Sequence, residues 1–172
     1  MKKWLGVIVA VSAVSASVFA DAPRSTNQVL DHLVGHWLLS GTIAGKNTTH
    51  DVSAEWVLNH GYLRIHEVSR EVGPSGTPAY EAMVFISYET KSGDYTCLWL
   101  DSTGSGGLSA EGFGHARSSE DSIPLIFCDS AGRISFENTF SYDRVADTWR
   151  WIMNNVENGK RKPFGRVTLV RQ

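Results

Sequence analysis

The chain of 172 residues is predicted to be an all-β protein, an antiparallel up-and-down barrel of about ten short strands with a short N-terminal helix. Runs rich in β-branched and aromatic residues return about every ten residues along the chain. Short turns rich in Gly, Asp and Asn separate these runs, and no helical pattern lies between them, as parallel strands would require. A β-sandwich is the alternative, because the sequence does not show whether the first and last strands pair.

The N-terminus is predicted to be an export signal. Lys2 and Lys3 precede a short apolar run, and Val18-Phe19-Ala20 resembles a cleavage site. We therefore expect a signal peptide at residues 1–20, a single barrel domain at residues 21–172, and a periplasmic or secreted location. No later run reaches the roughly 18 apolar residues of a spanning helix, so we expect no stable membrane insertion.

Composition argues against a nucleic-acid partner. The formal net charge is −2 at pH 7, and a nucleic-acid surface needs a broad basic face. In residues 21–172 the one basic run is Lys160-Arg161-Lys162, which we place in a solvated hairpin turn.

The clearest pairing signal is a central hairpin. Residues 80–88 and 95–100 are rich in strand-forming side chains and flank the turn Lys91-Ser92-Gly93-Asp94. Apolar residues follow one another directly at Met83-Val84-Phe85-Ile86, so both faces of this hairpin are apolar and it belongs in a covered sheet or a barrel wall.

The remaining elements follow from turn and capping signals. Ser25-Thr26-Asn27-Gln28 has the form of a capping box with Ser25 as the N-cap, and Gly35 ends the short helix. The other strands are predicted at residues 36–44, 51–58, 62–69, 108–116, 122–128, 133–142, 148–156 and 164–171.

Two cysteines leave two alternatives open. Export favours a disulfide between Cys97 and Cys128. In a simple meander, however, another strand separates them and holds their Cα atoms about 9–10 Å apart, which favours two buried thiols.

Gly35-His36-Trp37, at the junction of the helix and the first strand, resembles the Gly-x-Trp signature of the calycins, which include lipocalins and fatty-acid-binding proteins. Together with Trp56-Val57-Leu58, Tyr62-Leu63 and Trp99-Leu100-Asp101-Ser102-Thr103-Gly104, it also resembles a family of small, often exported bacterial proteins of unassigned function. The resemblance implies a calycin-like barrel. It also implies that the Trp37 ring closes one end beneath a basic residue of the last strand, Arg166 or Arg171.

A related barrel family, the nitrobindins, binds haem through a histidine near the C-terminus. Residues 164–171 contain no histidine, so we expect no cofactor. The six histidines show no metal-ligand spacing either.

Polar residues on inward faces are the candidate site residues, since a barrel of this size encloses side chains or one small ligand. Strand alternation points Glu67 and Asn138 inward. Glu67 would lie at the rim, be hydrogen-bonded inside, or contact a ligand. Asn138 would contact a ligand or satisfy a neighbouring backbone group.

Three tryptophans, Trp56, Trp99 and Trp151, are predicted to line a cavity, with core packing as the alternative. Asp101 ends the central hairpin, begins a glycine-rich turn and is the candidate polar contact at the mouth. Of the histidines, His66 and His115 lie in predicted strands and would act as acid or base only if they faced the cavity.

These observations predict an exported barrel that binds a small apolar molecule. Its contacts would be Trp56, Glu67, Trp99, Asp101, Asn138 and Trp151, without a metal. One alternative is a barrel enzyme with Glu67 or His66 as the base, although no Gly-x-Ser-x-Gly elbow is present to anchor a hydrolase triad. The other is a packed barrel that acts through its surface or as a homodimer.

Overall fold

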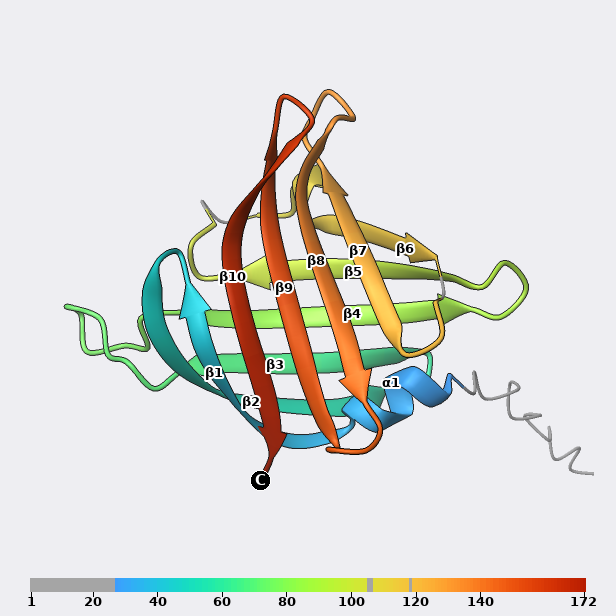
Figure 1. The fold of residues 1–172 in the computed structure, drawn as a ribbon, viewed down its shortest axis with the longest axis horizontal. Helices are drawn as coiled ribbons and strands as arrows, with labels where there is room; N and C mark the ends of the chain where they lie inside the picture. The colour runs from blue at the N-terminus through green and yellow to red at the C-terminus, as the bar shows by residue number, and fades with distance from the viewer. Residues whose placement is uncertain (1–26, 105–106, 118) are drawn as a thin grey trace, which may run out of the picture.

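The computed structural model describes residues 27–104, 107–117 and 119–172. They form one closed antiparallel barrel, in which the strands are ordered β1-β10-β9-β8-β7-β6-β5-β4-β3-β2 (Figure 1). The first and last strands pair, with Trp37 opposite Arg171 and Ile43 opposite Gly165. This closure confirms the predicted barrel and excludes the sandwich.

The helix α1 (Gln28–Leu33) precedes β1, and a one-turn 3₁₀ helix η1 (Ala110–Gly112) precedes β6. The strands are β1 (Gly35–Ile43), β2 (Lys46–Val57), β3 (Tyr62–Ser69), β4 (Glu81–Glu89), β5 (Asp94–Asp101), β6 (Phe113–Arg117), β7 (Ser122–Cys128), β8 (Ile134–Asp143), β9 (Thr148–Glu157) and β10 (Lys160–Arg171). Each strand pairs with its neighbour in the chain, as a meander requires, and β3 and β7 have their predicted bounds.

Three strand starts differ from the prediction by more than one residue. β2 and β10 begin earlier, at Lys46 and Lys160, because their polar first residues continue the backbone pairing of the hairpins without apolar alternation. The run Lys160-Arg161-Lys162 is therefore exposed strand rather than turn. β6 begins later, at Phe113, because η1 occupies the preceding residues.

The helix α1 closes one end of the barrel. Its N-cap is Asn27, whose side chain accepts a hydrogen bond from Leu30 N at 3.0 Å, while the predicted cap Ser25 lies outside the described residues. Leu30 and Leu33 are fully buried. The Trp37 indole donates to Leu33 O at 2.7 Å, which fixes the end of the helix to β1.

Arg171 covers Trp37, as the calycin resemblance implies for one of the two arginines. Its Cζ lies 4.1 Å from the centroid of the Trp37 ring. The guanidinium also donates to Val34 O at 3.0 Å and to Asp147 Oδ2 at 2.7 Å. Arg171 therefore joins the last strand to the chain just after α1.

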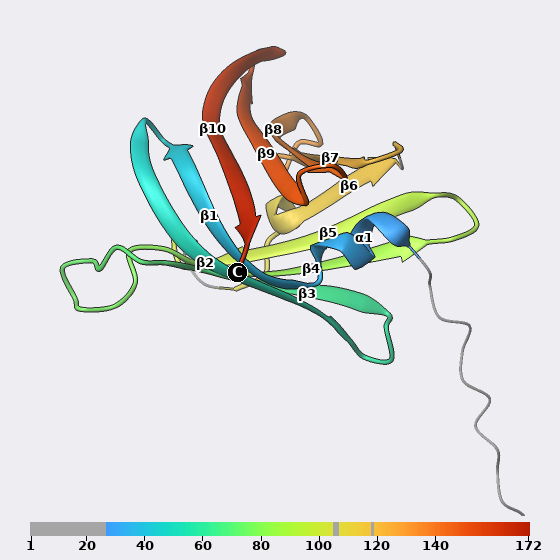
Figure 2. The same ribbon diagram turned by 60° about the horizontal axis from the view of Figure 1, so that its bottom comes forward.

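The helix α1 lies at one end of the barrel (Figure 2), and the interior from that end to the middle is filled by buried side chains. Its inward side chains there are not exposed at all, which leaves no room for water against them. They include Leu39, Leu63, Ile65, Val84, Ile86, Cys97, Ile123, Leu125, Phe140, Trp149, Trp151 and Leu169.

Both cysteines are free thiols. Cys97 on β5 lies opposite Gly114 of β6, and Gly114 lies opposite Phe127 of β7, next to Cys128. The intervening strand separates the thiols as the meander argument predicts. Burial raises the pKa of Cys97 to about 12, which keeps this thiol protonated.

The described residues include the helices α1 and η1. No helix among them has both the length and the apolar character needed to cross a bilayer. Within the same residues, no cluster of His, Cys, Asp and Glu has an arrangement that could hold a metal ion.

Candidate functional site

The end of the barrel opposite α1, called here the far end, differs from the packed interior in exposure. It comprises the β1–β2 turn, the end of β3, the start of β4, the end of β5 and the turns that precede β8 and β10 (Figure 1). Half-buried side chains lie here, among them Thr48, Tyr80, Trp99, Phe136 and Phe164. The four aromatic side chains pack against the buried core. The far end therefore presents an aromatic surface that solvent reaches in part.

A buried pair of His50 and Glu67 lies beneath this surface. His50 is 3% exposed and Glu67 is 2% exposed. His50 Nδ1 lies 2.5 Å from Glu67 Oε1. The strand register causes the contact, because β2 and β3 pair antiparallel and place both side chains on the inner face, with His50 opposite Ser69. The expectation of a rim position for Glu67 is wrong; the carboxylate is inside and paired.

Thr48 extends this pair toward the far end. Its Oγ1 lies 2.7 Å from His50 Nε2. A carboxylate only accepts hydrogen bonds, so we assign the proton of a neutral imidazole to Nδ1, which leaves Nε2 to accept from the threonine hydroxyl. The result is a continuous row of hydroxyl, imidazole and carboxylate from half-buried to fully buried positions.

Tyr80 and Trp99 border the row. The Tyr80 ring stacks on His50, with 5.6 Å between centroids, and its hydroxyl accepts a hydrogen bond from the Trp99 indole at 3.1 Å. Burial, followed by the charges of Glu67 and Asp101, raises the pKa of Tyr80 far above its ordinary value. The phenol therefore keeps its proton and remains a hydrogen-bond donor.

An aromatic stack connects the far end to the core. Trp99 packs edge-on to Phe140, with centroids 6.5 Å apart, and Phe140 stacks on Trp151 at 4.3 Å. Trp151 Nε1 and Asn138 Oδ1 are both buried and have no hydrogen-bond partner among the described residues. Each such atom costs about 1–3 kcal/mol. The expectation that Asn138 satisfies a neighbouring backbone group does not hold for this oxygen.

The six predicted site residues do not form one site. Glu67 and Trp99 lie at the far end, and Asn138 and Trp151 lie deeper in the interior. Trp56 lies at the opposite end, where its indole donates to Asp31 Oδ1 of α1 at 2.8 Å.

Asp101 belongs to the far end but serves its own turn. Its Oδ1 accepts hydrogen bonds from Thr103 N at 2.8 Å, Thr103 Oγ1 at 2.6 Å and Gly104 N at 3.2 Å. This oxygen therefore holds the start of the glycine-rich turn in place, while residues 105 and 106 lie outside the described part.

Among the described residues the buried histidine is His50, which lies one residue before the predicted strand at 51–58. His66 lies on the outer face of β3, where its Nε2 is 2.7 Å from Glu81 Oε1, and His115 is exposed. The proposal of His66 as a base inside the barrel is therefore wrong. A longer β2 would have identified His50, because counting back in twos from buried Val52 places His50 and Thr48 on the inner face.

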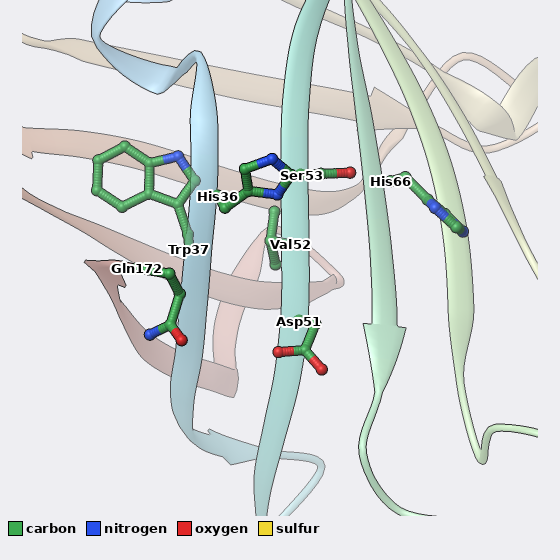
Figure 3. A pocket seen from close by; sticks show the side chains of 7 residues that line it. All are labelled: His36, Trp37, Asp51, Val52, Ser53, His66 and Gln172. Carbon is green, nitrogen blue, oxygen red and sulfur yellow. The ribbon is translucent and has the colours of Figure 1, made fainter.

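A separate pocket of about 400 Å³ lies on the outside of the barrel (Figure 3). Figure 3 shows His36, Ser53 and His66 on the adjacent strands β1, β2 and β3, which the register places in one row. The pocket is also lined by Trp37, Asp51, Val52 and Gln172. Arg70 binds the Asp51 carboxylate at 2.6 Å, and His66 is held by Glu81. With two of its polar groups already paired on the surface, this pocket offers less chemistry than the far end.

No protein-family model matches the chain, and no curated protein matches its sequence. Among solved structures, the chain is similar to a redesigned β-barrel, with 12% sequence identity and a TM-score of 0.45. The match covers 87% of this chain and 99% of that one.

Proposed function

We propose that the protein is an exported calycin-like barrel that binds a small, uncharged aromatic or apolar molecule at the far end. The observation that carries this proposal is the half-exposed aromatic surface, with Tyr80 and Trp99 at its centre, above the buried His50–Glu67 pair. Binding sites for small molecules typically combine apolar walls with a few polar groups that fix orientation.

The charges at the far end favour an uncharged ligand. The carboxylate of Glu67 is already bonded to His50, and the described inward side chains at this end include no Lys or Arg. A charged ligand would lose its hydration without a counter-charge. The Thr48 and Tyr80 hydroxyls suit a ligand with a carbonyl or hydroxyl group.

The energetics of the interior also support a binding role. Glu67 and His50 are both removed from water, and a buried polar pair seldom adds stability beyond that of apolar residues of similar volume. A buried amide oxygen without a partner, as in Asn138, is unfavourable for folding. Such groups are costly in a barrel built for stability alone.

The calycin-like assignment and the export signal belong to the same proposal. Support comes from α1 at one end and from Arg171 over Trp37, the arrangement implied by the resemblance. Residues 1–20 supply the signal pattern. An exported barrel of this type would meet its ligand in the periplasm or outside the cell.

The test is a titration with the uncharged aromatic probe N-phenyl-1-naphthylamine, in which the fluorescence of the probe measures binding. Trp99→Phe should weaken affinity about five-fold, because it removes aromatic contact and the indole bond to Tyr80. Trp56→Phe is the matched control, since Trp56 is also half-buried and bonds an oxygen through its indole, but at the opposite end. Equal affinity in both variants, or no binding to the wild type, would contradict the proposal.

A second candidate is a packed barrel that acts through its surface, as a homodimer. An outer row of Phe85, Leu98 and Phe113 on adjacent strands favours it, and Phe113 is 42% exposed. Sedimentation would then give a concentration-dependent mass that Phe113→Ser abolishes. A monomer mass at all concentrations would rule this candidate out.

A further inference from the structure

We propose that Thr48, His50 and Glu67 form a catalytic relay for acyl transfer, in which Thr48 is the nucleophile, His50 the general base and Glu67 the group that orients His50. The substrate class is a small ester with an aromatic or apolar body. The inference rests on the proposed function, because the substrate would enter at the same far end, but it adds a chemical step to binding.

The two contacts of the relay have the required order and length. Thr48 Oγ1 is 2.7 Å from His50 Nε2, and His50 Nδ1 is 2.5 Å from Glu67 Oε1. A nucleophile bonded to a base, which is itself oriented by a third group, is the arrangement that activates a hydroxyl. It is recognised by geometry and not by residue order, so the missing Gly-x-Ser-x-Gly elbow does not argue against it.

The three residues of the relay differ in burial. Such chemistry requires a nucleophile that is more accessible than its base and the group that orients the base. Glu67 and His50 are almost completely buried, whereas Thr48 is half-buried. Across β1, the residue opposite Thr48 is Gly41, where Val167 of β10 fills the place of a side chain. Glu67 is thus shielded from water, whereas Thr48 is the one residue of the relay that solvent reaches in part.

Tyr80 supplies a donor beside the relay. Its ring stacks on His50, and its oxygen already accepts from Trp99. The phenol proton is therefore left to donate, since the described contacts include no acceptor for it. A donor in this position suits the negative oxygen that develops when a hydroxyl attacks an ester carbonyl.

The reaction balances with water as the only co-reactant. Thr48 Oγ attacks the carbonyl carbon and His50 Nε2 takes the hydroxyl proton; the carbon–oxygen bond of the leaving group breaks, and the departing alcohol or phenol takes that proton. Water then attacks the acyl-threonine while His50 takes a water proton. The bond between acyl carbon and Thr48 Oγ breaks, and the proton returns to Oγ.

The test uses an aryl fluorophosphonate and the full exported protein, with peptide mass spectrometry to locate the adduct. The phosphorus–fluorine bond breaks, fluoride leaves, and a stable bond forms between Thr48 Oγ and phosphorus while His50 takes the proton. We expect one adduct per chain at Thr48. Thr48→Val should abolish it, and Thr48→Ser should retain it.

Two further variants separate chemistry from folding. Thr49→Val is the matched control, because the neighbouring Thr49 has the opposite strand parity, and it should label at the wild-type rate. Glu67→Gln should slow labelling by about a hundredfold or more, since the base loses its orienting carboxylate. Circular dichroism reports folding of each variant, so Thr48→Val still decides the test if Glu67→Gln fails to fold.

The outcomes distinguish the two proposals. A wild type that binds the probe but is not labelled, or that is labelled equally in Thr48→Val, overturns the relay and leaves the binding function standing. Labelling at Thr48 without probe binding upholds the relay and contradicts the aromatic ligand. Neither labelling nor binding overturns both.

Discussion

The two ends of the barrel are built from the same ten strands and differ in chemistry. At the α1 end, Leu30 and Leu33 fill the interior, and the indoles of Trp37 and Trp149 donate to carbonyl oxygens of the helix. At the far end, aromatic side chains are half-exposed above the His50–Glu67 pair. The α1 end is thus closed by buried side chains, whereas the far end is the one at which we propose that a ligand binds.

The largest expected effect comes from shortening Leu33, a side chain of α1 that fills the closed end of the barrel. Leu33→Ala should lower the free energy of unfolding by about 3 kcal/mol, because Leu33 is fully buried and its loss leaves a cavity. Urea denaturation measures this change. Affinity of the folded variant for N-phenyl-1-naphthylamine should be unchanged, and a loss of affinity would show that the two ends are not separate.

A smaller effect is expected at Arg171, which stacks on Trp37 and binds Asp147. Arg171→Met should cost about 1–2 kcal/mol, from the loss of the cation–π contact and of a partly exposed ion pair. Arg166→Met, on the exposed face of the same strand, is the control and should change stability by less than about 0.5 kcal/mol. Similar losses in both variants would contradict the closing role of Arg171.

At Asn138, stability and binding should change in opposite directions. Asn138→Leu removes a buried oxygen without a partner and should raise stability by about 1 kcal/mol. If the ligand bonds this amide, affinity falls in the same variant. Asn154→Leu, of opposite parity on the neighbouring strand, is the control. A destabilised Asn138→Leu would show that the amide holds the core together.

The smallest effect concerns acid pH and the α1 end. The Arg171 hydrogen bond holds the pKa of Asp147 below its ordinary value of 3.8. A carboxyl whose pKa is lower in the folded protein than in the unfolded chain stabilises the fold at pH values above its pKa in the unfolded chain. This contribution disappears as the pH falls through the pKa of the folded protein, below about pH 4. Asp147→Asn should therefore flatten the loss of stability between about pH 4 and pH 2 relative to the wild type. If stability depends on pH in Asp147→Asn as it does in the wild type, this contribution of Asp147 is excluded.

The fold was predictable because the alternation of apolar and polar residues along the sequence indicates where the strands lie. The inward direction of Glu67 and Asn138 also followed from alternation, and both are buried. His50 was missed because Asn47 to Asp51 are polar without interruption, so no apolar residue marked the start of β2. Trp56 lies near the end of the second strand and Trp99 near the end of the fifth, so the predicted up-and-down order already separates them. Placing both in one site was therefore inconsistent with the predicted topology.

The most direct test of the difference between the ends is a ¹⁵N–¹H spectrum of the tryptophan indoles, recorded during titration with N-phenyl-1-naphthylamine. Each indole N–H gives its own resonance, assigned by Trp→Phe variants. We predict that the Trp99 resonance shifts with saturation, while the resonances of Trp37 and Trp56 at the α1 end stay in place. Shifts at Trp37 and Trp56 with an unmoved Trp99 would place binding at the wrong end and contradict the account.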